Sequence, residues 1–194
     1  TPSAAGNFTP PLLSAEQHTL QERMIQAKSL LLSAGYGPSR PLNLTVSYRE
    51  TGDEPQVIRA IAAMWQKHLH VNITLKPRTP GQPPNSAANV TGATVQAAFN
   101  HPAAFLNPLT SGHPENIAKF INPQYDSLIQ RAERESSELR RNQDYNQAEH
   151  LIADQVPVAP AFQYATHRLV APGAPGHAEQ TPQGDAYRRE VWTE

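Results

Sequence analysis

The sequence predicts an α/β fold in which a βαβ unit forms part of a mixed sheet flanked by helices. Residues 42–48 and 71–75 alternate apolar and polar side chains, as half-buried strands do. Between them, residues 53–69 repeat apolar side chains at helical spacing, with Pro55 in the first turn, where its missing N–H removes no hydrogen bond. A strand, a helix and a strand in this order predict two parallel strands joined by a right-handed crossover.

An earlier helix is expected before this unit. Residues 14–17 have the sequence Ser-Ala-Glu-Gln, which is typical of a capping box at a helix N-terminus. Apolar residues then recur at helical spacing, and Gly35 is expected to end the helix. The inward-facing residues of this helix would be Leu20, Met24, Ala27, Leu31 and Ala34.

The C-terminal half predicts two further helices. Asn122 and Pro123 are typical of an N-cap and a first helical position. A second helix is expected over 137–154, and extended chain over 156–164 and 167–170. The first helix should bury Tyr125, Leu128, Ile129 and Ala132, and the second should bury Leu139, Tyr145, Ala148, Leu151 and Ile152.

Residues 77–92 interrupt the periodic pattern. They contain four prolines and two glycines and no periodic apolar set. We therefore expect an exposed, Pro-rich loop. A third strand is expected directly after this loop, over 93–99.

Composition limits the functional classes. The formal net charge is −1, and the largest basic clusters are the pairs Arg140-Arg141 and Arg188-Arg189, so nucleic acid is not an expected partner. The absence of cysteine excludes a disulfide framework and a thiol nucleophile. No apolar run approaches the roughly 20 residues that span a bilayer.

Patterns that would indicate catalysis or metal binding are weak. His68 and His70 lie two residues apart, but no third ligand stands at a recognisable spacing, so we expect no metal site. The chain also lacks a Gly-x-Ser-x-Gly elbow and a phosphate-cradling loop. We therefore expect no catalytic residues, no cofactor and no enzyme activity. His101 and His113 are candidates for contact with a ligand.

Short segments occur in a fixed order along the chain. They are AKSLLLSAGY at 27–36, LNLTV at 42–46, IAAMW at 61–65, VNITL at 71–75, FLN at 105–107, NPQYDSLI at 122–129 and VPVAP at 156–160. This order resembles the C-terminal lobe of the bacterial periplasmic oligopeptide-binding proteins, the extracellular solute-binding family 5 that serves ABC importers. In that family, two α/β lobes close over a peptide whose backbone adds to their strands.

The resemblance implies an organisation for the chain. Residues 1–13 would be a lead-in, 14–170 the C-terminal α/β lobe, and 171–194 an extended tail that returns toward the missing first lobe. Because the sequence opens with Thr1 rather than Met, we expect a processed chain or a fragment, and the resemblance favours a fragment. Its expected partners are the N-terminal lobe of the same parent protein and an inner-membrane ABC permease. The expected location is the periplasm, or the cell surface through a lipid anchor on the missing N-terminus.

The resemblance also implies where a ligand would bind. The family has a carboxylate, paired with the peptide's free amine, just before a Pro-x-x-Phe-Leu segment, which stands here at 102–106. The position of that carboxylate falls on Ala98, and an arginine of the peptide branch falls on Gly92. A buried ammonium without a counter-charge costs on the order of several kcal/mol. We therefore expect that this chain does not anchor a free α-amine.

The expected ligand-contacting residues are Phe99, Asn100 and His101, with Ala98 and Gly92 shaping the pocket without charge. Two functions stay open. The first is a component of an ABC importer that binds a peptide or peptide-like solute. The alternative is a degenerate binding-protein scaffold that acts as a protein-interaction or structural module without small-ligand transport. The shortened, Pro-rich loop favours the alternative, and the retained segments favour solute binding.

Overall fold

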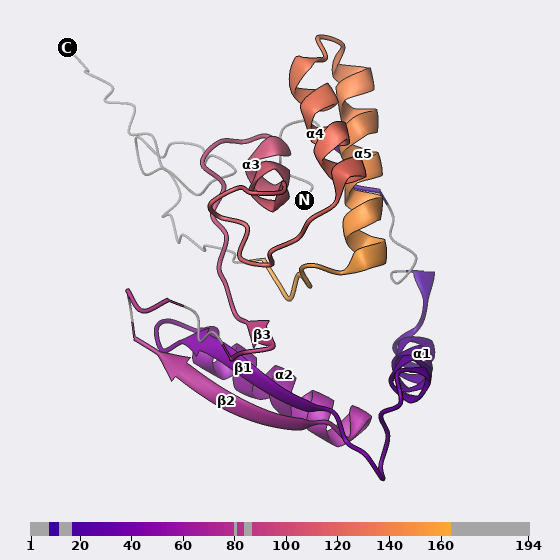
Figure 1. Cartoon of the computed structure of the whole chain (residues 1–194), viewed down its shortest axis with the longest axis vertical. Coiled ribbons are helices and arrows are strands. Elements are labelled where there is room, and N and C mark those ends of the chain that lie inside the picture. The colour runs from indigo at the N-terminus through magenta and orange to yellow at the C-terminus, as the bar shows by residue number, and fades with distance from the viewer. Residues whose placement is uncertain (1–7, 12–16, 80, 84–86, 164–194) are drawn as a thin grey trace, which may run out of the picture. The chain divides into compact units, whose positions relative to one another are not determined.

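The computed structural model describes residues 8–11, 17–79, 81–83 and 87–163. The chain divides into two compact units. Ser14–Thr94 form one, which we call the sheet unit, and Thr1–Leu13 with Val95–Glu194 form the other, which we call the helical unit. Figure 1 labels the helices and strands of the two units.

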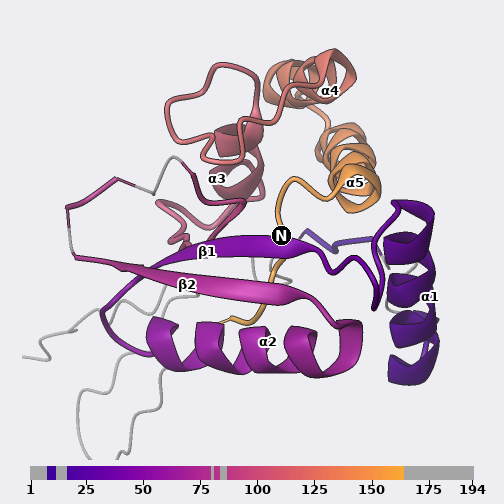
Figure 2. The same ribbon diagram turned by 60° about the horizontal axis from the view of Figure 1, so that its bottom comes forward.

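The sheet unit contains the predicted βαβ crossover. β1 (Asn43–Arg49), α2 (Glu54–Leu69) and β2 (Asn72–Arg78) follow one another along the chain. β1 and β2 pair in parallel over their whole length, so that Arg49 lies opposite Arg78. Figure 2 shows α2 running along one face of the two strands. The prediction of a parallel βαβ unit is confirmed.

β1 is the central strand of a sheet with the order β2-β1-β3. β3 (Val90–Thr91) pairs in parallel with the other edge of β1. The third strand expected over 93–99 is therefore wrong, because the pairing occurs inside the Pro-rich segment. The Asn89 backbone N–H donates to the Thr45 carbonyl at 2.9 Å, and the Asn89 side-chain oxygen accepts from the Thr45 N–H at 2.9 Å. A strand of two residues is too short to show an alternation of apolar and polar side chains in the sequence.

α1 (Leu20–Ser33) begins later than the sequence pattern suggested. Its N-cap is Thr19, whose hydroxyl accepts from the Glu22 N–H at 3.3 Å while its own N–H donates to the Glu22 carboxylate at 2.7 Å. The helix does not begin at the capping-box pattern of residues 14–17, as expected, because Thr-Leu-Gln-Glu at 19–22 satisfies the same pattern and caps α1. Residues 14–16 lie outside the described part of the chain. Gly35, with φ of 82°, follows the end of the helix, as predicted.

The apolar face of α1, which was expected to point inward, is not buried. The helix has no buried residue, and Leu20 is 68% exposed. Met24, Ala27 and Leu31 are half-buried. The apolar stripe thus predicted the helix correctly, but it did not predict burial in this chain.

The helical unit contains four described elements: α3 (Ala103–Leu106), η2 (Asn107–Leu109), α4 (Pro123–Arg134) and α5 (Glu138–Gln155). The N-cap predicted for α4 is confirmed. The Asn122 side-chain oxygen accepts from the N–H groups of Gln124 and Tyr125 at 2.9 and 3.1 Å, so two otherwise free donors of the first turn are satisfied.

α4 and α5 lie side by side and form the main core (Figure 1). The predicted inward face of α4 is confirmed. On α5 the prediction is confirmed for Tyr145 and Ala148 but is wrong for Leu139, which is 71% exposed in the first turn. The core residues are Phe8, Ala103, Leu106, Phe120, Tyr125, Leu128, Ile129, Ala132, Tyr145 and Ala148.

Tyr125 joins α4 to α3 through a buried hydrogen bond. Its hydroxyl donates to the Leu106 carbonyl at 2.7 Å, and its ring meets Phe120 edge-on at 5.4 Å. Burial, with smaller contributions from Glu149 and Asp126, raises the pKa of the Tyr125 hydroxyl, which therefore stays protonated as a donor.

Replacing Tyr125 by phenylalanine is expected to lower the stability of the helical unit by about 1–3 kcal/mol, because the buried Leu106 carbonyl would lose its partner. Hydrogen exchange of the α3 and α4 amides measures the loss. Tyr36→Phe is the matched control, since the contact described for Tyr36 is made by its ring, against Arg40. Equal effects of the two variants would contradict a role for the buried hydrogen bond.

The sequence also predicted a mixed sheet and extended segments near the C-terminus. Both strand pairs in the described residues are parallel. The extended segments that would complete a mixed sheet form no strand over 157–163, and residues 164–170 lie outside the described part, as do 1–7 and the tail 171–194. None of the helices that the structure describes has the length and apolar character needed to cross a membrane.

Candidate ligand-binding site

The segment expected to contact a ligand lies in the helical unit, directly before α3. Ala98, Phe99 and Asn100 are exposed there, and His101 is half-buried. Phe99 and His101 are in ring contact, with centroids 6.3 Å apart. The Phe99 ring itself is 51% exposed, so it presents an apolar surface to a potential ligand.

His101 is the most firmly held residue of this segment. Its Nδ1 accepts from the Ala103 N–H at 3.2 Å, and its ring meets Tyr145 of α5 edge-on at 5.6 Å. Because Nδ1 is an acceptor, the neutral ring carries its proton on Nε2. Burial and the nearby Arg141 lower the pKa of His101, while Glu138 acts in the opposite direction. Near neutral pH the residue is therefore an uncharged hydrogen-bond donor.

We expect an NMR titration to place the pKa of His101 below the usual value of about 6.5. Arg141→Gln should raise that pKa by removing a repulsive charge, and Glu138→Gln should lower it further. Since the folded state then holds fewer protons than the unfolded state, stability should fall as the pH drops through the usual pKa toward the folded one. Shifts of the same sign in both variants would contradict this account.

Gly92 belongs to the sheet unit and is fixed by its surroundings. Its N–H donates to the Ser47 carbonyl of β1 at 2.7 Å. A Cβ at this position would lie 2.8 Å from Glu54 Oε1, 3.3 Å from Ile58 Cδ1 and 3.4 Å from Tyr48 Cβ. A side chain at residue 92 would therefore require the Glu54 carboxylate to move.

The carboxylate that fills this space is Glu54, in the first turn of α2. Glu54 is buried and binds Arg49 twice, from the Arg49 N–H to Oε1 and from Arg49 Nε to Oε2, both at 2.9 Å. Arg78 reaches the same region, since its Nη2 donates to the Gly92 carbonyl at 3.1 Å. These charged residues were missed at the sequence level, because the strands predicted over 42–48 and 71–75 stop short of Arg49 and Arg78.

A polar hollow of about 380 Å³ lies in the helical unit between η2 and α4. It is lined by Asn107, Thr110, Ser111, His113, Asp126, Ile129, Gln130 and Glu133. Its two carboxylates serve the fold: Asp126 accepts from the Ser111 N–H at 2.8 Å, and Glu133 accepts from the Asn107 side chain at 2.7 Å. His113, the second histidine considered at the sequence level, lines this hollow, whereas Phe99 and His101 do not.

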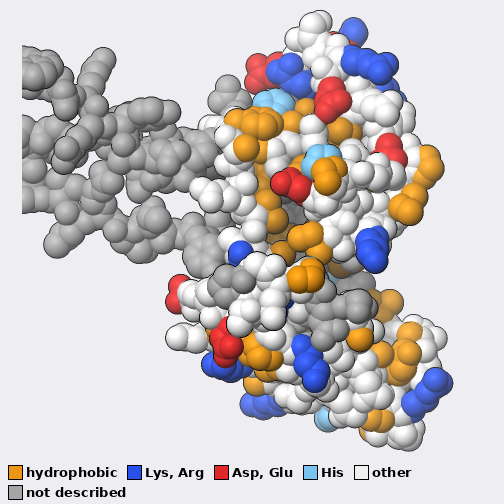
Figure 3. All heavy atoms as spheres, turned by 60° about the vertical axis from the view of Figure 1, so that its left-hand side comes forward, with side chains coloured by type: hydrophobic (Ala, Val, Ile, Leu, Met, Phe, Trp, Pro, Cys, Tyr) orange, Lys and Arg blue, Asp and Glu red, His pale blue; other side chains and the backbone are white. Residues whose placement is uncertain are grey.

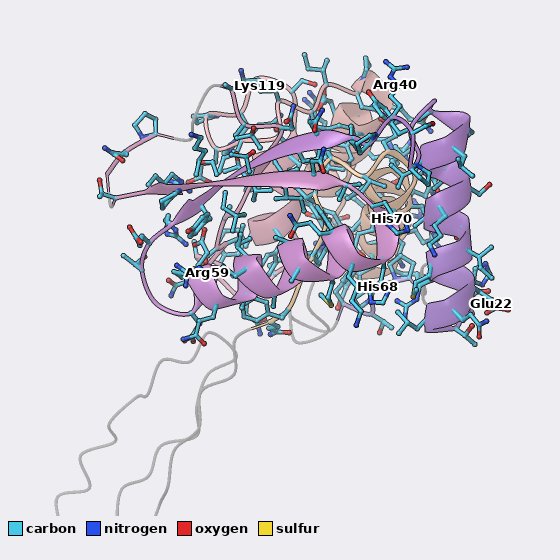
Figure 4. The ribbon with its side chains drawn as sticks, turned by 90° about the horizontal axis from the view of Figure 1, so that it is seen from below. Glu22, Arg40, Arg59, His68, His70 and Lys119 are labelled. Carbon is cyan, nitrogen blue, oxygen red and sulfur yellow. The ribbon has the colours of Figure 1, made fainter. Side chains whose placement is uncertain are left out.

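The remaining histidines of interest lie at the end of α2. Figure 4 shows His68 and His70 there, and His70 ends the helix with a left-handed backbone at φ of 55°. Among the residues with described positions, no three His, Cys, Asp or Glu side chains come together as metal ligands. His70 therefore has a local backbone role.

The charged side chains are mixed in sign. Figure 3 shows acidic and basic side chains interspersed with apolar ones on the visible face. The formal net charge of −1 agrees with this picture. The face seen in Figure 3 shows no stripe of a single sign of charge among its described residues.

Known proteins similar to this chain are periplasmic binding proteins, although no family model matches it. It is 37% identical to the periplasmic murein peptide-binding protein MppA of Escherichia coli, over 99% of this chain and 36% of that protein. It is 30% identical to the probable deoxycholate-binding periplasmic protein YgiS of E. coli, over 99% and 37%, and 27% identical to the oligopeptide-binding protein OppA of E. coli, over 97% and 37%.

The fold agrees with the sequence comparison. The solved structure of the E. coli murein tripeptide-binding protein MppA matches 84% of this chain with a TM-score of 0.79 and 37% identity, and the match covers 33% of that structure. The chain thus spans about a third of the length of the curated relatives that it matches. By sequence and by fold, the chain is similar to about a third of the length of the periplasmic murein peptide-binding and oligopeptide-binding proteins.

Proposed function

We propose that this chain is the C-terminal, ligand-contacting lobe of a periplasmic solute-binding protein that delivers peptides or peptide-like solutes to an ABC importer. The observation that carries the proposal is the likeness to the murein peptide-binding protein over 99% of the chain. The partners of this lobe are then the N-terminal lobe of the same protein and an inner-membrane permease. The periplasmic relatives favour the same location here, either free or through a lipid anchor.

The preferred ligand in this proposal lacks a free α-amine. Ala98 is exposed and uncharged, and Gly92 has no side chain and lies against the Glu54 carboxylate. Phe99, Asn100 and His101 then contact the ligand through an apolar ring and neutral polar groups. The relative named for deoxycholate, at 30% identity, supports the idea that ligands other than free peptides suit this scaffold.

A second candidate function is a protein-interaction module built on the same scaffold. It is favoured by α1, which buries no residue although it carries several large apolar side chains. Those more than 60% exposed are Leu20, Ile25, Leu30 and Leu32. Such a surface suits contact with protein, either the other lobe or a separate partner.

A thermal-shift screen of the full-length protein that carries this chain tests the proposal. The ligand set comprises free peptides, N-acetylated peptides and deoxycholate. A ligand at about 100 times its Kd stabilises by roughly 2.7 kcal/mol, which is readily measured. Stabilisation by acetylated peptides or deoxycholate is expected. Stabilisation by free peptides alone would contradict the assignment of Ala98, and no shift with any ligand would favour the interaction module.

A further inference from the structure

β1 and β2 both end on an arginine, and the parallel register places the two residues opposite each other. Arg49 is the last residue of β1, and Arg78 is the last residue of β2. Like charges directly opposite on neighbouring strands are destabilising unless a counter-charge compensates them. The carboxyl end of this sheet therefore needs negative charge.

Glu54 supplies one negative charge, which forms a salt bridge with Arg49. Both Glu54 oxygens accept from Arg49, at 2.9 Å each, and the Glu54 side chain is buried against β1. The carboxylate is held from two sides, by the backbone and by the guanidinium of the same residue. The Glu54 carboxylate therefore compensates the charge of Arg49.

Within the described residues, Arg78 makes its hydrogen bonds to neutral groups. Its Nη1 donates to the Gln82 carbonyl at 3.3 Å and its Nη2 to the Gly92 carbonyl at 3.1 Å. Its Nε is buried and has no hydrogen-bond partner among the described residues, and no ion pair described there includes Arg78. A buried donor without an acceptor is unfavourable. Within the described part of the chain, the guanidinium therefore has no counter-charge, and its Nε–H has no acceptor.

The position of Arg78 suits recognition of a ligand. Strands flank β1 on both sides in the order β2-β1-β3, and Arg78 lies at their carboxyl ends. Open parallel sheets bind ligands outside this edge, at the strand where the direction of the chain reverses. A guanidinium presents a planar set of donors that matches the two oxygens of a carboxylate.

We propose that Arg78 recognises a carboxylate of the ligand and so selects anionic peptides or peptide-like solutes. The proposal rests on the solute-binding function proposed above and adds the charge of the ligand to it. The acceptor is either the C-terminal carboxylate of a peptide or a carboxylate on one of its side chains. Arg78 then supplies a positive charge beside Gly92, which itself carries none.

The test measures peptide affinity of the full-length protein by calorimetry. The ligands are N-acetylated peptides of one sequence with a free C-terminal carboxylate, with a C-terminal amide, and with an amide plus one internal glutamate. The variants are Arg78→Gln and Arg78→Lys. Arg59→Gln is the matched control, because Arg59 lies exposed on α2 (Figure 4).

The unmodified protein should bind one carboxylate-bearing peptide about tenfold or more tightly than the amide. The carboxylate that gives the gain, C-terminal or side-chain, identifies the acceptor. Arg78→Gln should abolish the preference while leaving amide affinity unchanged, which also shows that the variant is folded. Arg78→Lys should keep part of the preference, and Arg59→Gln should keep all of it.

Other results overturn the proposal in distinguishable ways. Binding of the amide and carboxylate peptides with equal affinity by the unmodified protein would refute carboxylate recognition while leaving solute binding intact. An equal loss of both affinities in Arg78→Gln would assign Arg78 a structural role only. No binding of any peptide or other solute would refute the proposed function itself, and the inference with it.

Discussion

Replacing Ala98 by aspartate is expected to give the full-length protein a preference for peptides with a free α-amine. Ala98 stands where the family resemblance places the carboxylate that pairs with that amine, and it is exposed in this chain rather than packed in the core. An aspartate there would supply the missing counter-charge to an ammonium that loses water on binding. Hydrogen bonds between charged groups contribute about 1.5–3 kcal/mol, so affinity for free peptides should rise about tenfold or more.

The comparison of free and N-acetylated peptides measures this gain. The acetylated peptide has no ammonium, so its affinity should stay the same or fall. Ala97→Asp is the matched control, because it adds the same charge one residue away from the inferred position. An equal gain in Ala97→Asp would assign the effect to general electrostatic attraction. No gain in Ala98→Asp would show that residue 98 does not face the ligand's N-terminus.

The elements with strong local signals were predictable from the sequence. Residues 42–75 contain a strand pattern, a helical pattern and a second strand pattern, and the right-handed crossover rule then leaves one arrangement. The start of α4 was predictable because Asn122 and Pro123 act within a single turn of helix. In each case, the physical cause lies within a few residues of the sequence position that shows it.

The elements that failed depend on choices between similar local signals or on distant partners. Residues 14–17 and Thr19–Glu22 both satisfy the capping-box pattern, and only the structure distinguishes them. β3 has two residues, which are too few for a periodicity to be detected. The side chain of Asn89, directly before it, accepts a hydrogen bond from β1. Leu139 is apolar at a helical spacing, but no neighbouring element covers it.

The candidate site likewise contains residues that the sequence predicted and residues that it did not. The segment from Ala98 to His101 could be predicted from an ordered set of sequence landmarks, although its ligand contacts stay a prediction. The charges around Gly92 could not, because they depend on the register of β1 and β2, which brings Arg49 beside Arg78. The predicted strands also ended at Tyr48 and Leu75, so both arginines lay beyond the predicted strand ends.

Replacing Gly92 by alanine is expected to destabilise the sheet unit by about 1–3 kcal/mol. The new methyl group would lie 2.8 Å from Glu54 Oε1. That oxygen cannot move away freely, because it accepts from the Arg49 N–H and its companion oxygen accepts from Arg49 Nε. The clash must therefore break a buried charged hydrogen bond or shift the start of α2. Hydrogen exchange of the β1 and α2 amides in the full-length protein measures the effect.

Two comparisons isolate this cause. Gly52→Ala is a matched control, since Gly52 has φ of 59° and open space around it, so its cost reports backbone strain alone. Glu54→Asp shortens the carboxylate side chain by one methylene group and should relieve the clash, making the Gly92→Ala/Glu54→Asp double variant more stable than the sum of the single effects predicts. Glu54→Gln keeps the full length and should give no such relief. Additive effects in the Asp pair would show that Glu54 is not what excludes a side chain at residue 92, and that the uncharged character of this position has another origin.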